Sequence, residues 1–454
     1  MNKLFAPFKR LSSTRRKVLS NVAWAMAGKA VSMVGVLFVG ILVGRYLGPE
    51  KYGLMNYVIS YVAIFEILAA FGLDNIEIRE LSRHSEDRDA IMGTCFGLRL
   101  IFACVAYLAI AVFLWRFESD SYTIKMILAY ALHLFVIPFN LARNYFTSIV
   151  QNKYVVQSQI LRTILGAGIK VALLWLRAPL TYFILAAAFD FFLLAGGYAA
   201  AYQKKAGHLR DWRFEWERVS FLLCEAFPLL LSGAAVIIYQ RIDQVIIKKM
   251  LNSAEVGYFA TAGLFVGVVL FLPSVLVQTI TPLLVRLRVQ NPSLYEQRKR
   301  EMMDVVVWSA LGVSLVVCVL ASPLIRWTYG VAYAPAVPVL QVLIWKTAGM
   351  SLATSSGQII IIEGLQKWVV VRNLLGCALC VGGNLILIPR LGILGSAWAT
   401  IVTVLGAGWF AHLLVPAYRP LFGIQCHSLL SGWKTLGAAH ALFFSRSKNG
   451  GARA

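Results

Sequence analysis

The sequence predicts an all-α polytopic membrane protein with about twelve transmembrane helices. Three observations support this fold class. The 454 residues are 59% hydrophobic and only 14% charged, which is too apolar for a soluble globular protein. Apolar runs of about 20 residues, the length that crosses a hydrocarbon core, recur along the whole chain. The hydrophilic connections between these runs are short, so they leave no room for a soluble catalytic domain.

The apolar runs form two sets of six. The spans of the first set are 22–47, 52–73, 91–115, 124–146, 155–176 and 180–202. Those of the second set are 221–245, 256–284, 305–327, 337–362, 368–388 and 393–418. The first run is too long for the apolar part of a cleavable signal, so we expect it to remain as the first helix.

This division predicts five parts of the chain. Residues 1–21 are a basic N-terminus, 22–202 an N-lobe of six helices, 203–219 a linker and 220–418 a C-lobe of six helices. Residues 419–454 are a tail, expected to hold an interfacial amphipathic helix or disordered residues. With both termini in the cytoplasm, the cytoplasmic side receives about three times as many lysines and arginines as the opposite side. The positive-inside rule therefore supports this orientation. Because it also accounts for much of the net charge of +22, we expect no nucleic-acid partner.

The two lobes contain similar segments at equivalent positions. LGPEKYG, residues 47–53, follows the first span, and LNSAEVG, residues 251–257, follows the seventh. Both begin with leucine and end with glycine at the same spacing. The sequence therefore predicts two six-helix bundles of parallel topology, as in transporters whose repeats are related by an axis along the membrane normal.

Six basic side chains lie inside the predicted spans. They are Lys29, Arg99, Arg162, Lys170, Lys346 and Arg372. A lysine or arginine at the bilayer centre costs about 2.5 to 3.5 kcal/mol, so we expect these side chains to face a hydrated interior that accepts an anionic substrate. Arg99 and Arg372 lie nearer to a span end, where anchoring at the membrane surface is the alternative.

The fifth span carries the clearest polar stripe. Gln159, Arg162, Gly166 and Lys170 fall within an arc of about 80° on one face of an apolar helix. This face either lines a substrate path or meets carboxylates of a neighbouring helix.

Acidic residues in the predicted spans are candidates for ion coupling or gating. Glu66 and Glu225 are deep enough to have raised pKa values unless they are paired with lysine or arginine. Arg241 and Asp243 could form a local ion pair or an outer gate at the end of the seventh span.

Several chemistries find no support in the sequence. It has no G-x-x-x-x-G-K-[ST] phosphate loop, and its six histidines are scattered without metal-ligand spacing. Cys377 and Cys380 lie deep in an apolar run and are interpreted as packing residues. We therefore expect no enzyme activity, no cofactor and no metal.

Three segments resemble the polysaccharide-transporter (Wzx-type oligosaccharide flippase) family of the multidrug/oligosaccharidyl-lipid/polysaccharide exporter superfamily. They are RYLGPEKYG at 45–53, RID at 241–243 before VGY at 256–258, and NLILIP at 384–389 followed by GILGSAWAT at 392–400. The similarity extends over residues 18–418, and the order and spacing of the segments carry it.

This resemblance implies two lobes around a central cavity that opens alternately to either side of the bacterial inner membrane. Such proteins move undecaprenyl-diphosphate-linked oligosaccharide units for O-antigen, capsule or exopolysaccharide synthesis. Polysaccharide polymerase and chain-length proteins are then possible partners, with the phospholipid bilayer around the protein. The embedded cations suit a diphosphate, which arginine binds bidentately and lysine as a point charge.

Two alternatives remain. A multidrug antiporter of the toxic-compound extrusion type would need an acidic, aromatic cavity for organic cations. A membrane-embedded polysaccharide polymerase or glycosyltransferase would need a large outer loop with catalytic carboxylates or arginines.

Overall fold

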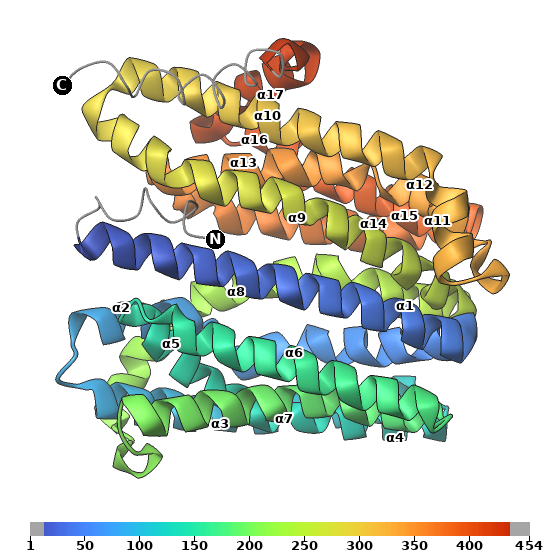
Figure 1. The fold of residues 1–454 in the computed structure, drawn as a ribbon, viewed down its shortest axis with the longest axis horizontal. Coiled ribbons are helices and arrows are strands. Elements are labelled where there is room, and N and C mark those ends of the chain that lie inside the picture. Colours follow the sequence, from blue (N-terminus) through green and yellow to red (C-terminus); the bar gives the residue numbers. More distant parts are fainter. Residues whose placement is uncertain (1–12, 436–454) are drawn as a thin grey trace, which may run out of the picture. The chain divides into compact units, whose positions relative to one another are not determined.

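The computed structural model describes the backbone of residues 13–435 and the side chains of residues 32–435 (Figure 1). These residues form helices and contain no β-strand, which confirms the predicted all-α fold. The side chain of Lys29 lies outside the described residues. The chain forms two compact units: residues up to Leu47 with Leu54–Ile237, and Gly48–Gly53 with the residues from Ile238 onward. The transitions between the units fall inside two helices, at Gly48–Gly53 and at Ile238, so the predicted lobe boundaries stay a prediction.

The first unit is built mainly from long helices. In chain order these are α1 (Ser13–Ala70), α2 (Asp74–Arg83), α3 (Arg88–Phe117), α4 (Ser121–Ala131), the 3-10 segment η2 (Leu132–Phe139), α5 (Asn140–Ser148), α6 (Asn152–Trp175), α7 (Leu180–Lys205) and the first half of α8 (Trp216–Met250). α6 packs along α7. One hydrophobic core, which includes Leu73, Met92, Phe146 and Tyr202, joins α2, α3, α5 and α7.

The second unit contains the remaining helices. They are α9 (Ser253–Gln290), α10 (Pro292–Val319), α11 (Ala321–Thr328), α12 (Ala336–Leu343), α13 (Lys346–Glu363), α14 (Val369–Leu391), α15 (Ile393–Leu405), α16 (Ala411–Leu414) and α17 (Arg419–Ser431). α14 packs closely on α15, and α9 on α10. Tyr295, Met303, Ile359 and Tyr418 belong to its buried core.

Ten helical stretches of the described residues are long and apolar enough to cross a membrane, which agrees with a multi-pass membrane protein. One of them, Ser32–Arg83, contains the second predicted span and residues 32–47 of the first, because α1 continues through its break at Gly48. The fifth predicted span corresponds to α6, which is too polar to be counted among the ten. The predicted spans and the observed helices therefore coincide along the chain.

The break in α1 lies in the first of the two repeated segments. Gly48 has φ 73° and ψ 169°, a backbone conformation that favours glycine, and Pro49 follows it. Within the second unit, a Cβ on Gly53 would lie 1.7 Å from the Ser253 carbonyl oxygen, and a Cβ on Gly257 would lie 2.1 Å from that of Pro49. The glycines at equivalent positions of the two segments therefore both contact the other segment.

Two hydrophilic regions outside the predicted spans are helical. The connection between the eighth and ninth predicted spans, residues 285–304, is mostly helical, since α9 runs to Gln290 and α10 begins at Pro292. Asn291 caps α10 by accepting a hydrogen bond from the Leu294 amide at 3.1 Å. α17 is docked in the second unit, where the Gln425 amide group donates to Ser356 Oγ at 2.7 Å and to the Gly408 carbonyl at 2.9 Å.

Candidate functional site

The polar stripe predicted on the fifth span lies on α6 and faces α7 at three of its four positions. Gln159 donates to the Tyr198 hydroxyl at 3.3 Å. Lys170 forms an ion pair with Asp190 of α7. A Cβ on Gly166 would lie 2.1 Å from Asp190 Oδ1, so the missing side chain makes room for this carboxylate. For Lys170, the alternative of neutralisation by a neighbouring helix is therefore correct in this structure.

Arg162, the other cation of the stripe, has different surroundings. It is half-buried, and it forms no ion pair with a carboxylate of residues 32–435. It lies eight positions before Lys170 on the same helix face, about 12 Å along the axis. Arg162 is therefore the uncompensated cation of this stripe.

Arg99 does not face water, and its prediction as a cavity residue is wrong. Its side chain is 0% exposed, and Nε and Nη2 donate to Glu77 at 2.7 and 2.8 Å. Nη2 also donates to Asp74 at 2.6 Å. Asn144 bridges the same two carboxylates at 2.8 and 2.6 Å, and Arg143 reaches Asp74 at 3.2 Å. Two carboxylates thus compensate this arginine, and through Asn144 and Arg143 the cluster also joins α5 to α2 and α3.

Of the two glutamates predicted for ion coupling, Glu225 differs from its expected burial. Glu225 is 44% exposed and forms an ion pair with Arg79 at 3.0 Å, because α2 brings Arg79 next to α8. Its expected burial is therefore wrong, and pairing with a cation is the correct alternative. Glu66 is half-buried in α1.

In the second unit, Asp243 is the centre of a buried polar cluster. Its side chain is nearly inaccessible, and its Oδ1 accepts hydrogen bonds from Cys380 Sγ at 3.0 Å and Asn384 Nδ2 at 3.1 Å. The Thr400 hydroxyl donates to Oδ2 at 3.0 Å, and Ser396 donates to Asn384 Oδ1 at 2.7 Å. All these donors are neutral. The expected ion pair of Asp243 with Arg241 is absent from the described residues, and Arg241 is exposed.

Lys346 and Arg372 are the remaining basic candidates. Lys346 begins α13, and Arg372 lies in the first turns of α14. Both are half-buried, and neither forms an ion pair with a carboxylate in the described part of the chain. Arg372 Nη1 is buried and has no hydrogen-bond partner there. Arg162 and Arg372 are thus half-buried cations without a carboxylate partner among these residues, whereas Lys346 is attracted electrostatically by Asp243 without a direct ion pair.

Sequence analysis did not connect Asp243 with its neutral partners, or Arg99 with Glu77 and Asn144. Cys380 and Asn384 lie four positions apart on α14, as Ser396 and Thr400 do on α15. Small polar residues four positions apart on two consecutive apolar helices are the sequence pattern that could have predicted the Asp243 cluster. Glu77 and Asn144, which bind Arg99, lie in polar stretches at helix ends and gave no comparable signal.

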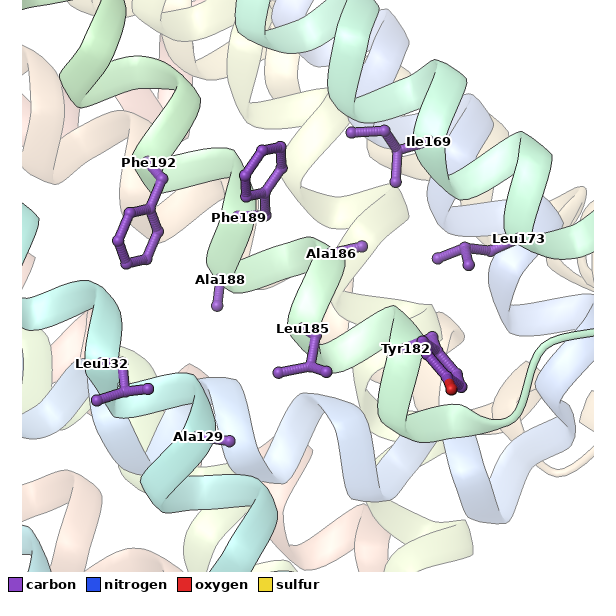
Figure 2. A pocket seen from close by; sticks show the side chains of 10 residues that line it. All are labelled: Ala129, Leu132, Ile169, Leu173, Tyr182, Leu185, Ala186, Ala188, Phe189 and Phe192. Carbon is purple, nitrogen blue, oxygen red and sulfur yellow. The ribbon is translucent and has the colours of Figure 1, made fainter.

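Among the described residues, no group of histidine, cysteine, aspartate and glutamate has the arrangement of a metal site. The first unit does contain an apolar pocket of about 470 Å³ between α4, η2, α6 and α7 (Figure 2). Its lining includes Leu132, Ile169, Leu173 and Phe189. These side chains are suited to hydrocarbon and not to a charged headgroup.

Comparison with known proteins identifies the family of this chain. Residues 18–288 match the family described as "Polysaccharide biosynthesis protein". No match was found among curated proteins. Among solved structures, the lipid II flippase MurJ in an inward closed conformation is similar with a TM-score of 0.68 and 13% identity, over 91% of this chain and 92% of that one.

Two other similar structures are transporters of the MOP superfamily. An inward-facing multidrug resistance MATE family transporter gives a TM-score of 0.63 at 15% identity, over 88% of this chain and 96% of that one. A transporter from Pyrococcus furiosus, described as having a binding pocket of reverse polarity, gives 0.59 at 14% identity, over 89% and 96%. At these identities the likeness concerns the fold. The family match covers more than half of the sequence, and this chain belongs to the polysaccharide biosynthesis protein family, with the fold of MOP-superfamily transporters.

Proposed function

We propose that this protein is a flippase that moves undecaprenyl-diphosphate-linked oligosaccharide units across the bacterial inner membrane by alternating access. One observation carries this proposal beyond the family: Arg162, Lys346 and Arg372 are cations in predicted spans, and none of them forms a direct ion pair with a carboxylate among the described residues. The glycans served would be O-antigen, capsule or exopolysaccharide.

These three cations would be energetically costly if they faced lipid. Three of them facing lipid would cost about 7 to 10 kcal/mol in total on insertion scales, which is comparable to the stability of a whole domain. Water and an anionic headgroup remove this cost. A diphosphate carries about two negative charges and offers bidentate acceptors for arginine and a point charge for lysine.

The same chemistry argues against the alternatives. An organic cation, the cargo of a multidrug antiporter, would be repelled by Arg162, Lys346 and Arg372. The only carboxylate of the Asp243 cluster is already bonded by three neutral donors. A polymerase or glycosyltransferase would need a large catalytic loop, and the described connections between long helices are short.

Asp243 is our candidate for coupling to an ion gradient. A buried carboxylate that meets neutral donors and no cation within ion-pair distance in the described residues can bind a proton or a monovalent cation without first breaking a salt bridge. Asp243→Asn should therefore leave headgroup binding intact and abolish the dependence of transport on the ion gradient. Unchanged gradient dependence in this variant would exclude Asp243 from coupling.

The test of the flippase uses reconstituted proteoliposomes. A fluorescent undecaprenyl-diphosphate sugar is placed in the bilayer, and a membrane-impermeant quencher reports its transfer between leaflets. The triple variant Arg162→Gln, Lys346→Met, Arg372→Gln should lose at least tenfold in transfer rate while remaining folded. Lys125→Met, which removes an exposed cation of α4, is the matched control and should retain the rate.

A triple variant that transfers the lipid at the wild-type rate would refute the headgroup assignment. Export of an ethidium-type cation by the wild type, together with no lipid transfer, would replace the flippase proposal by the multidrug one.

A further inference from the structure

Lys170 differs from Arg162, Lys346 and Arg372 in having a carboxylate within ion-pair distance. Its ammonium group contacts Asp190 Oδ2, and the two side chains are only 14% and 19% exposed. Arg162, on the same face of α6, has no such partner in the described residues. The same face of α6 thus carries Lys170, which is paired with a carboxylate, and Arg162, which is not paired with any carboxylate in the described residues.

The Asp190 carboxylate is held against α6 by a specific steric arrangement. Position 166 is glycine, and any Cβ there would lie 2.1 Å from Asp190 Oδ1. That oxygen is buried and accepts no hydrogen bond from the described residues. Lys170 therefore satisfies one carboxylate oxygen while the other stays unsatisfied, which makes this a poorly bonded ion pair.

The ion pair is largely removed from solvent, because its two side chains are only 14% and 19% exposed. Ile169 and Phe189, the residues that precede Lys170 and Asp190 in the chain, line the apolar pocket between α6 and α7 (Figure 2). A cation with so little exposure is strongly destabilised when it loses its counter-ion. Lys170 can therefore leave Asp190 only when another anion takes its place.

We propose that Asp190 competes with the substrate headgroup for Lys170. Asp190 holds Lys170 in the empty protein, and the diphosphate of the bound substrate displaces Asp190 from this lysine. The inference rests on the proposed function. Arg162 first attracts the headgroup, and the exchange at Lys170 then replaces one anion by another of higher charge. A headgroup with no charge cannot drive this exchange, so Asp190 is a specificity-determining residue.

The magnitude follows from the occupancy of the ion pair. If Asp190 holds Lys170 in about nine of ten molecules, the apparent Kd for the anion is about tenfold above the Kd of the freed lysine. Removing the competitor should therefore tighten binding by about tenfold.

Two variants remove the competition in different ways. Asp190→Asn removes the negative charge. Gly166→Ala keeps both charges but pushes the carboxylate away from α6. Gly168→Ala, on the same helix with no atom within 4 Å of its added Cβ, is the matched control. The full-length protein in nanodiscs is titrated with farnesyl diphosphate, inorganic pyrophosphate and farnesol, and folding is followed by thermal unfolding.

We expect Asp190→Asn and Gly166→Ala to bind both diphosphates about tenfold more tightly than the wild type and Gly168→Ala, with farnesol binding unchanged. The gain should vanish when Lys170→Met is added. Unchanged or weaker diphosphate binding by both folded variants, or a gain that survives Lys170→Met, would overturn the proposal.

Different results would refute the flippase and the competition by Asp190. A gain for pyrophosphate that requires Lys170, without any binding of farnesyl diphosphate, would uphold the competition and refute the lipid-linked substrate. Normal farnesyl diphosphate binding that no Asp190 or Gly166 variant tightens would uphold the flippase and refute the competitor. Absence of diphosphate binding in every variant would refute both.

Discussion

Replacing Arg99 with methionine removes the cation of the most buried ionic cluster in the first unit. Glu77 is then left 0% exposed without its two hydrogen bonds from the guanidinium group, and Asp74 loses its bond of 2.6 Å. Removing one partner of a buried ion pair costs about 3 to 5 kcal/mol, because the other charge stays buried and uncompensated. We expect the Arg99→Met protein to lose this amount of unfolding free energy.

The second variant of the experiment removes both charges. In Arg99→Met, Glu77→Gln no isolated charge remains on these two residues, while Asp74 keeps Arg143 at 3.2 Å and Asn144 at 2.8 Å. We therefore expect the double variant to recover part of the loss, with a net cost of about 1 to 2 kcal/mol relative to the wild type. Tryptophan fluorescence during thermal unfolding in detergent should rank Tm as wild type, then double variant, then single variant.

The same proteins test whether Arg99 contacts substrate. A structural role predicts that leaflet transfer per folded molecule is largely retained in the double variant. A double variant less stable than the single one would refute the ion-pair reasoning. Wild-type Tm in Arg99→Met with abolished transfer would restore Arg99 as a headgroup ligand.

Three further predictions concern single contacts. Gly257→Ala should lower Tm and impair transfer because its Cβ would lie 2.1 Å from the Pro49 carbonyl, whereas Gly263→Ala on the same helix meets nothing within 4 Å and should be neutral; equal Tm values for the two would contradict this contact. Gln425→Leu removes donors to two buried acceptors and should cost about 1 to 3 kcal/mol in unfolding free energy, measured by denaturant titration. Glu225→Gln, which breaks an ion pair between side chains 36% and 44% exposed, should cost no more than about 1 kcal/mol in the same titration, and a larger loss would contradict the weak contribution expected of an exposed pair.

The sequence alone determined the class of this protein. Length, apolar runs and the distribution of charge predict a helical multi-pass membrane protein, because the bilayer requires about 20 apolar residues per crossing and penalises every embedded charge. The similar segments at 47–53 and 251–257 predicted the repeat, and the structure places their glycines in equivalent contacts. The break at Gly48 is also readable locally, as glycine followed by proline.

Only the tertiary structure decided what each charge does. Arg99 and Arg162 look alike as basic residues in apolar helices, yet Arg99 binds Glu77 and Asp74 while Arg162 meets no described carboxylate. Asp243 receives its donors from positions 137 to 157 residues away, brought together by the packing of α8, α14 and α15. Periodicity identifies the face on which a side chain lies. Helix packing determines which group lies opposite that face. This group decides whether a buried cation forms a structural ion pair or belongs to a binding site.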